Sequence, residues 1–186
     1  MANGTLKVSN IQTSSGSGTI TLGQSGETVD FSNATTTLSS AMKSSPTFVS
    51  KGVSSSQAIS NETYTTLTNW NTPSSLLGSI TFSSGIYTVG TAGTYFFYAS
   101  PDIGNMADGD RAFVVIQASE DSFSSSSDIS INGKSMNANG NADVTPQVSC
   151  VHTCTASTQV RVQVWQDYGG NRNFQGGTFM GYRLLG

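Results

Sequence analysis

Charged side chains are scarce in this sequence of 186 residues. Asp, Glu, Lys and Arg together make up only 10% of it, whereas a typical globular protein has about 25%. Serine, threonine, asparagine and glycine occupy most polar positions instead. Ser, Thr and Asn form hydrogen bonds with nearby backbone and favour turns and caps, so the composition argues against long amphipathic helices. The sequence therefore predicts an all-β fold.

Other shortages exclude whole classes of function. Eight Lys and Arg residues are outnumbered by eleven Asp and Glu residues, so the chain lacks the basic surface expected of a protein that binds nucleic acid. No apolar run approaches the roughly 20 residues that span a bilayer, and the N-terminus lacks the apolar stretch of a signal peptide. We therefore expect that the chain is made in the cytoplasm and that it does not insert into a membrane.

The sequence has one histidine, His152, between its two cysteines, Cys150 and Cys154. A hydrolase triad would need His152 as its base. In a strand, the three side chains would project to one face with the thiols about 13 Å apart, beyond disulfide reach and poor for one metal ion. Ordinary thiols, a disulfide across a tight turn and a metal site on a threefold axis stay open as alternatives. We expect no enzymatic activity and no cofactor.

The length fits one domain with an N-terminal extension. Residues 1–46 contain two short alternating segments, 5–8 and 19–22, separated by Ser and Gly. An isolated two-stranded unit is marginal in water, so this arm needs a partner surface, either sister copies or another protein. We place the boundary after residue 46 and assign residues 47–186 to the main domain.

Strand-like segments with turn residues between them recur through the main domain, as in a sandwich or barrel. The dipeptide Asn132-Gly133 predicts a type I′ hairpin turn. The alternating segment 159–166 predicts one buried face of valines. The predicted strands cover 47–50, 57–67, 78–82, 86–89, 93–100, 111–119, 127–131, 144–151, 159–166 and 178–185.

The segment 93–99 differs from the others because aromatic residues occupy both faces. A strand of this kind must be covered on both sides. The second sheet of a sandwich would cover one face, and a neighbouring subunit around a threefold axis would cover the other. A central strand buried within a single chain is the alternative.

Three segments, 86–98, 158–166 and 178–185, resemble strands of one known family, in the same order and spacing. This family is the jelly roll shared by the globular head of complement component one-q and the tumour necrosis factor ligands. The resemblance implies an all-β jelly-roll β-sandwich that forms homotrimers. The resemblance does not extend to a collagen stalk, because the chain has no Gly-X-Y run. Four aromatic residues are expected to pack in the core or between the subunits of the trimer: Tyr95, Phe97, Trp165 and Tyr182.

The N-terminal segments 4–13 and 19–22 are similar to the opening of structural proteins in tailed phages of marine bacteria and cyanobacteria. That resemblance implies a bacteriophage virion protein, either a fibre or appendage or a capsid decoration protein. Residues 1–46 would then attach it to other virion proteins. The alternative is a receptor-binding tip that recognises a host-surface glycan, and a hydrolase ranks last.

Candidate sites for a glycan lie on the predicted surface loops. Carbohydrate sites combine aromatic rings with amides and carboxylates, and the same rings could instead fill the core edge or a subunit interface. The candidate residues for binding are Trp70, Phe123, Tyr168 and Arg172.

The segment 101–110 is acidic and could supply oxygen ligands to calcium. It lacks the spacing of an EF-hand loop, and acidic loops are usually solvated turns. We therefore assign no metal. The weak candidates are Asp102, Asp108 and Asp110, together with His152 for an axial site.

Overall fold

The computed structural model describes residues 47–137 and 140–184, so the predicted arm of residues 1–46 lies outside the described residues. The described part consists of strands joined by turns and loops, and no helix able to cross a membrane occurs in it. The strands are β1 (Thr47–Lys51), β2 (Gln57–Ile59), β3 (Thr65–Thr66), β4 (Ser75–Leu77), β5 (Thr81–Ser83), β6 (Ile86–Thr88), β7 (Gly93–Met106), β8 (Arg111–Ser119), β9 (Ser127–Ser135), β10 (Ala142–Val144), β11 (Val148–Cys154), β12 (Gln159–Gln166) and β13 (Arg172–Arg183).

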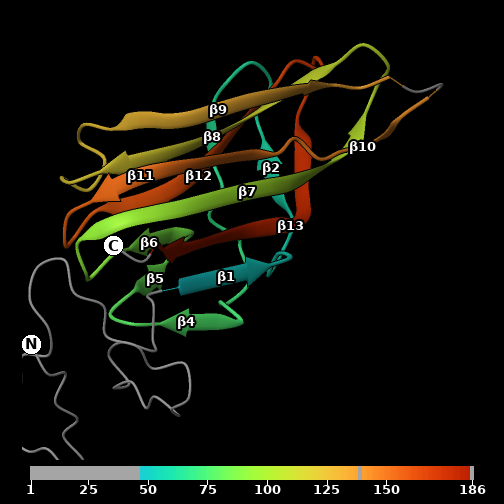
Figure 1. The fold of residues 1–186 in the computed structure, drawn as a ribbon. Coiled ribbons are helices and arrows are strands. Elements are labelled where there is room, and N and C mark those ends of the chain that lie inside the picture. The colour runs from blue at the N-terminus through green and yellow to red at the C-terminus, as the bar shows by residue number, and fades with distance from the viewer. Residues whose placement is uncertain (1–46, 138–139, 185–186) are drawn as a thin grey trace, which may run out of the picture. The chain divides into compact units, whose positions relative to one another are not determined.

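The strands form two antiparallel sheets. The first sheet has the order β10-β7-β13-β1-β4, with β11 also paired to β7 and β2 to β13. The second sheet has the order β5-β6-β12-β8-β9, with β3 paired to β12. Figure 1 shows β11, β7, β13, β1 and β4 following one another across the first sheet. The predicted all-β sandwich is confirmed.

The core lies between the two sheets and follows the two-residue alternation of the strands. Val160, Val162 and Val164 of β12 are fully buried, as the alternating segment predicts. Phe48 of β1 and Phe179 of β13 face them from the first sheet, and their ring centroids lie 5.1 Å apart in an edge-on arrangement. Aromatic pairs of this geometry add stability beyond their buried area, so this contact strengthens the first sheet's side of the core.

Tyr87 of β6 brings a polar group into this core. Its ring stacks on Phe48 at 3.6 Å between centroids, and its hydroxyl is hydrogen-bonded to the buried hydroxyl of Ser50. Ser50 in turn donates to the carbonyl of Asn71 at 3.0 Å. Burial raises the pKa of Tyr87 to about 12, although the hydrogen bond with Ser50 opposes that rise. The hydroxyl therefore stays neutral and satisfied at physiological pH.

The predicted hairpin turn at Asn132-Gly133 is wrong. Strand β9 continues from Ser127 to Ser135 and pairs with β8 along its length. Gly133 lies opposite Phe113, and a Cβ at this position would come within 2.5 Å of the Phe113 ring. Glycine is needed here for the close approach of a ring, and the pairing with β8 outweighs the local preference for a turn.

Some of the other predicted strand boundaries agree with the structure and some do not. The predicted strands 111–119 and 159–166 coincide with β8 and β12. The predicted strand 57–67 is two short strands, β2 and β3, separated by a turn in which Glu62 has a φ of 52°. Strand β7 continues to Met106, well beyond its predicted end, because β13 and β10 pair with its second half.

Gly181 of β13 lies between two core rings, since an added Cβ would come within 2.6 Å of both Phe48 and Phe97. We predict that Gly181→Ala lowers the free energy of unfolding by about 1–3 kcal/mol, the usual cost of overpacking a core. Gly170→Ala is the control, because its Cβ would meet nothing closer than 4.0 Å. Urea unfolding followed by tryptophan fluorescence measures both, and equal effects would contradict the prediction.

Candidate functional site

Strand β7 divides its aromatic residues between two environments. Tyr95 and Phe97 point into the sandwich and are fully buried. Phe96 and Tyr98 alternate with them and therefore point to the outer face of the first sheet. Of the two roles expected for Tyr95 and Phe97, the structure shows packing in the core and not between subunits, because their own chain already encloses them. Phe96 and Tyr98 are the aromatic residues of β7 that are left for contact with a neighbour.

The register of the first sheet gathers apolar residues on this outer face. One row across the strands pairs Phe96 with Val151 on one side and with Tyr182 on the other, and Tyr182 with Thr47, which pairs with Leu77. Directly paired residues of antiparallel strands project to the same side. Val151 is 60% exposed, Leu77 52% and Tyr182 39%.

The next row continues this apolar surface. Tyr98 pairs with Met180, and Met180 pairs with Val49. Within the first row, Phe96 and Tyr182 pack with ring centroids 5.3 Å apart. Apart from Thr47, the named residues of these rows are apolar or aromatic, and we call these seven the outer apolar face: Val49, Leu77, Phe96, Tyr98, Val151, Met180 and Tyr182. None of them is charged, and large contiguous apolar surfaces of this kind mark interaction sites.

Trp165 lies on the other sheet. It projects from β12 on the side opposite the buried valines and contacts Phe113 edge-on, with ring centroids 5.5 Å apart. The Arg111 guanidinium lies 5.8 Å from the centroid of its ring. Trp165 therefore cannot share an interface with Tyr182 on one flat surface, and only Tyr182 of the four predicted packing residues lies on the outer apolar face.

The aromatic rings predicted to contact a glycan are largely occupied by the chain itself. Trp70 is only 3% exposed and packs edge-on against Phe174 at 4.6 Å, so its predicted place on a surface loop is wrong. Its loop is drawn onto the sheet by a bridge to Val53. Phe123 has the Arg161 guanidinium 3.9 Å from its ring centroid. A sugar would have to displace that cation to stack on this face of the ring.

Tyr168 and Arg172, two further candidates for glycan contact, are brought together by the structure. The Arg172 guanidinium lies over the Tyr168 ring, 2.9 Å from its centroid. Burial lowers the pKa of Arg172, and the charge of Asp110 opposes this shift. Like Phe123, Tyr168 has one ring face covered by a cation, so the loop offers less aromatic surface than its sequence indicates.

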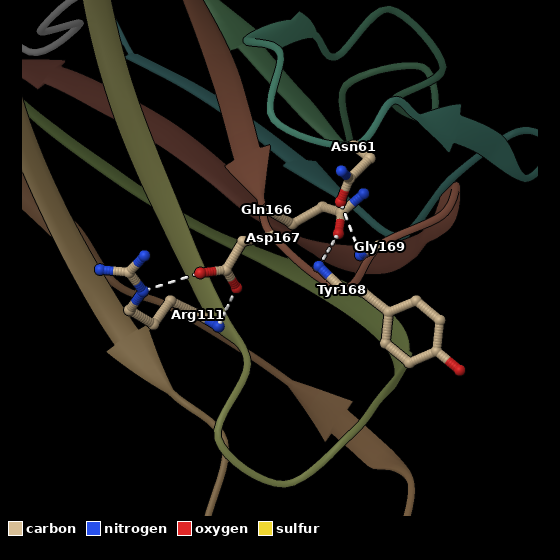
Figure 2. A network of polar contacts seen from close by, with 6 residues as sticks. All are labelled: Asn61, Arg111, Gln166, Asp167, Tyr168 and Gly169. Carbon is tan, nitrogen blue, oxygen red and sulfur yellow. Dashed lines mark hydrogen bonds and ion pairs between the residues drawn. The ribbon is translucent and has the colours of Figure 1, made fainter.

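A buried amide fixes the loop that carries Tyr168 (Figure 2). Gln166 is fully buried, and its side-chain oxygen accepts a hydrogen bond of 2.8 Å from the Tyr168 backbone. Its Nε2 donates to the carbonyls of Ile59 and Gly170 at 3.2 and 2.8 Å. Asn61 accepts from the backbone of Gly169 at 2.7 Å. The β2–β3 and β12–β13 loops are thereby held together without any ligand.

An ion pair closes the other side of this network (Figure 2). Asp167 accepts from the Arg111 backbone at 2.6 Å and from its Nε at 2.7 Å. Burial raises the pKa of Asp167, but the hydrogen bonds and charge of Arg111 outweigh burial and hold it below its usual range. Because the Arg111 side chain is 56% exposed, solvent screens the pair and its contribution to stability is small. Its main effect is to orient the loop.

The acidic residues of the segment 101–110 do not form a metal site. Asp102 lies within β7 and accepts from the Thr145 hydroxyl at 3.2 Å. Asp110 accepts from the backbone of Ala107 at 2.8 Å. Asp108 belongs to the turn between β7 and β8. Across residues 47–137 and 140–184, no group of three or more His, Cys, Asp or Glu side chains could hold a metal ion.

His152 does not lie on the outer apolar face. It pairs with Tyr95 and so projects to the opposite side of the first sheet, which excludes it from an axial site on that face. It lines a hollow with Glu120 and Asp121. Hydrogen bonds from the Thr155 and Thr158 hydroxyls hold the pKa of Glu120 below its usual range. This carboxylate is therefore already paired within the chain.

The two cysteines are free. Both project to the core side of β11, because Cys150 pairs with Phe97 and Cys154 with Gly93. Burial raises the pKa of each thiol to about 11. The thiolate is the reactive form, so neither residue is suited to act as a nucleophile at neutral pH.

Sequence reasoning missed most of the outer apolar face. Phe96 and Tyr98 were recognisable, because they alternate with the residues chosen for packing. Met180 is likewise identified once Phe179 is placed in the core. Val151 and Leu77 were not recognisable, since only the pairing of β11 and β4 places them on the same row.

No protein-family model matches the chain, and no curated protein matches it. Solved structures do share its fold. Eiger TNF from S. frugiperda is 13% identical, with a TM-score of 0.61, over 76% of this chain and 94% of that chain. Murine APRIL at pH 5.0 is 14% identical, with a TM-score of 0.56, over 74% of this chain and 99% of that chain. The fold is a jelly-roll β-sandwich. It is of the tumour necrosis factor type, as the sequence resemblance implied.

We predict that Gln166→Met destabilises the chain because the backbone groups of Tyr168 and Gly170 lose their buried partner. Each unsatisfied group costs about 1–3 kcal/mol. Gln163→Met is the matched control, since the amide of Gln163 is less buried and donates to the Thr66 hydroxyl alone. Urea unfolding gives the free energies, and hydrogen exchange should be faster in the β12–β13 loop of Gln166→Met only. Equal losses in both variants would contradict this account of the network.

Proposed function

We propose that this chain is a structural protein of a bacteriophage virion that acts by assembly as a homotrimer. The outer apolar face carries this proposal. It consists of seven uncharged residues on a sheet surface that the chain's own second sheet does not cover. Three copies that turn this face toward a common axis would remove it from water.

The virion location rests on the phage resemblance of the N-terminal segments 4–13 and 19–22. In this proposal residues 1–46 attach the trimer to other virion proteins, and the jelly roll forms a fibre, an appendage or a capsid decoration. The chain acts without catalysis and without a cofactor. Its thiols support this assignment because burial keeps them protonated.

We predict that Tyr182→Asp dissociates the trimer while each chain stays folded, because a carboxylate in the middle of the outer apolar face would be buried without a partner. Tyr64→Asp is the control, since Tyr64 is 46% exposed and lies outside the first sheet. Light scattering after size-exclusion chromatography gives the mass, and circular dichroism checks the fold. A wild-type monomer at micromolar concentration, or a trimer in Tyr182→Asp, would count against the proposal.

Cryo-electron microscopy of the phage particle that encodes the chain tests the virion location. We expect threefold density for the jelly roll on the particle, with residues 1–46 contacting another virion protein. A particle that lacks the chain, established by mass spectrometry of purified virions, would overturn the location and leave the trimer to be judged separately.

A further inference from the structure

The outer apolar face reaches both edges of the first sheet. The row that contains Tyr182 begins at Val151 on β11 and ends at Leu77 on β4. These two residues are the most exposed large hydrophobic side chains of the row, at 60% and 52%. An apolar row that ended inside the sheet would need only one flat partner. This row instead reaches both edges of the sheet. A flat partner covers the edges of a sheet less well than its centre, so the apolar side chains at the two edges would stay partly exposed to water.

Within residues 47–137 and 140–184, neither edge carries a further backbone-paired strand on its outer side. Strand β4 is the last strand of its sheet, next to β1. Beyond β11 lies β9 of the second sheet, joined to it by side chains: Ser130 donates to the carbonyl of Ser149 and Asn132 to that of Gln147. A hollow of about 430 Å³ opens at this seam, lined in part by Tyr98 and Ile131. The β11 edge therefore has room for side chains of another chain.

Symmetry decides which residues such an edge can meet. In a twofold dimer both copies use the same patch in the same way, so a contact between two β4 edges would bring Leu77 close to its own counterpart. A threefold ring is built from heterologous contacts, in which one edge meets a different edge of the next copy. Three sheets that face a common axis form a triangular prism, and the β4 edge of each then meets the β11 edge of the next.

Leu77 and Val151 lie on the same row, so they reach the corners of this prism at the same height along the strands. We infer that Leu77 of one copy packs against Val151 of the next, at the border of the seam between β9 and β11. This inference rests on the proposed homotrimer. It adds that the ring is closed by contacts between β4 and β11, so that the row through Phe96 and Tyr182 continues from copy to copy.

Thiol cross-linking in the full chain tests this contact. The variant Leu77→Cys/Val151→Cys carries one new thiol at each edge. Within one chain these positions are separated by four strand spacings of about 4.8 Å, roughly 19 Å in all, which a short bismaleimide cannot span. The native Cys150 and Cys154 react slowly because burial raises the pKa of each to about 11.

We expect the double variant to give covalent dimers and trimers on a denaturing gel. Each single variant should give almost none, and the two single variants expressed together should give dimers. The control Leu77→Cys/Tyr64→Cys keeps the first thiol and moves the second to an exposed loop, and it should cross-link at least tenfold less.

Three results would overturn the inference, and they are distinguishable. A trimer by light scattering without cross-links in the double variant would refute the contact between Leu77 and Val151 but retain the proposed homotrimer. Efficient cross-linking of Leu77→Cys alone would indicate a twofold contact and refute the ring. A monomer in light scattering would refute the proposed homotrimer and the contact with it.

Discussion

A strand with aromatic residues on both faces imposes the constraint on which the rest of the structure depends. The second sheet covers the side of β7 that carries Tyr95 and Phe97. The described residues form two layers, and no third layer of theirs covers the side that carries Phe96 and Tyr98. The two rows through Phe96 and Tyr98 on that side carry apolar and small polar residues and no charge. The open side of β7 thus links the packing of one chain to the proposed association of three.

The loops at the end of β12 differ from the outer face of β7, because their polar groups form hydrogen bonds within the chain. Gln166 serves three backbone groups, and the guanidinium of Arg172 covers the Tyr168 ring. A loop held in this way keeps its conformation without a partner, and its aromatic surface is already in use. This end of the sandwich is therefore less suited to bind a partner through aromatic rings than the outer apolar face.

The sequence predicted those features that depend on local alternation, and missed those that depend on register. Strand β12 matches its predicted bounds because apolar and polar residues alternate along most of it, and β8 matches them as an apolar run, residues 112–116, between polar ends. The Asn132-Gly133 turn failed because Phe113 of the neighbouring strand occupies the space above Gly133. Trp70 failed because its loop folds back onto β13, where Phe174 receives its ring. In each failure the deciding partner is distant in the sequence, so no local pattern could reveal it.

The scarcity of charge has a physical consequence for the proposed assembly. The described rows of the outer apolar face contain no charged side chain, so sister copies in the proposed trimer would meet there without electrostatic repulsion. Attraction between such faces comes from apolar burial, which depends on temperature far more than on moderate salt. An ion pair of the described residues, Arg111 with Asp167, lies at the loops, where it orients a segment. This ion pair therefore serves local geometry, and in the proposed trimer association would rest on apolar surface.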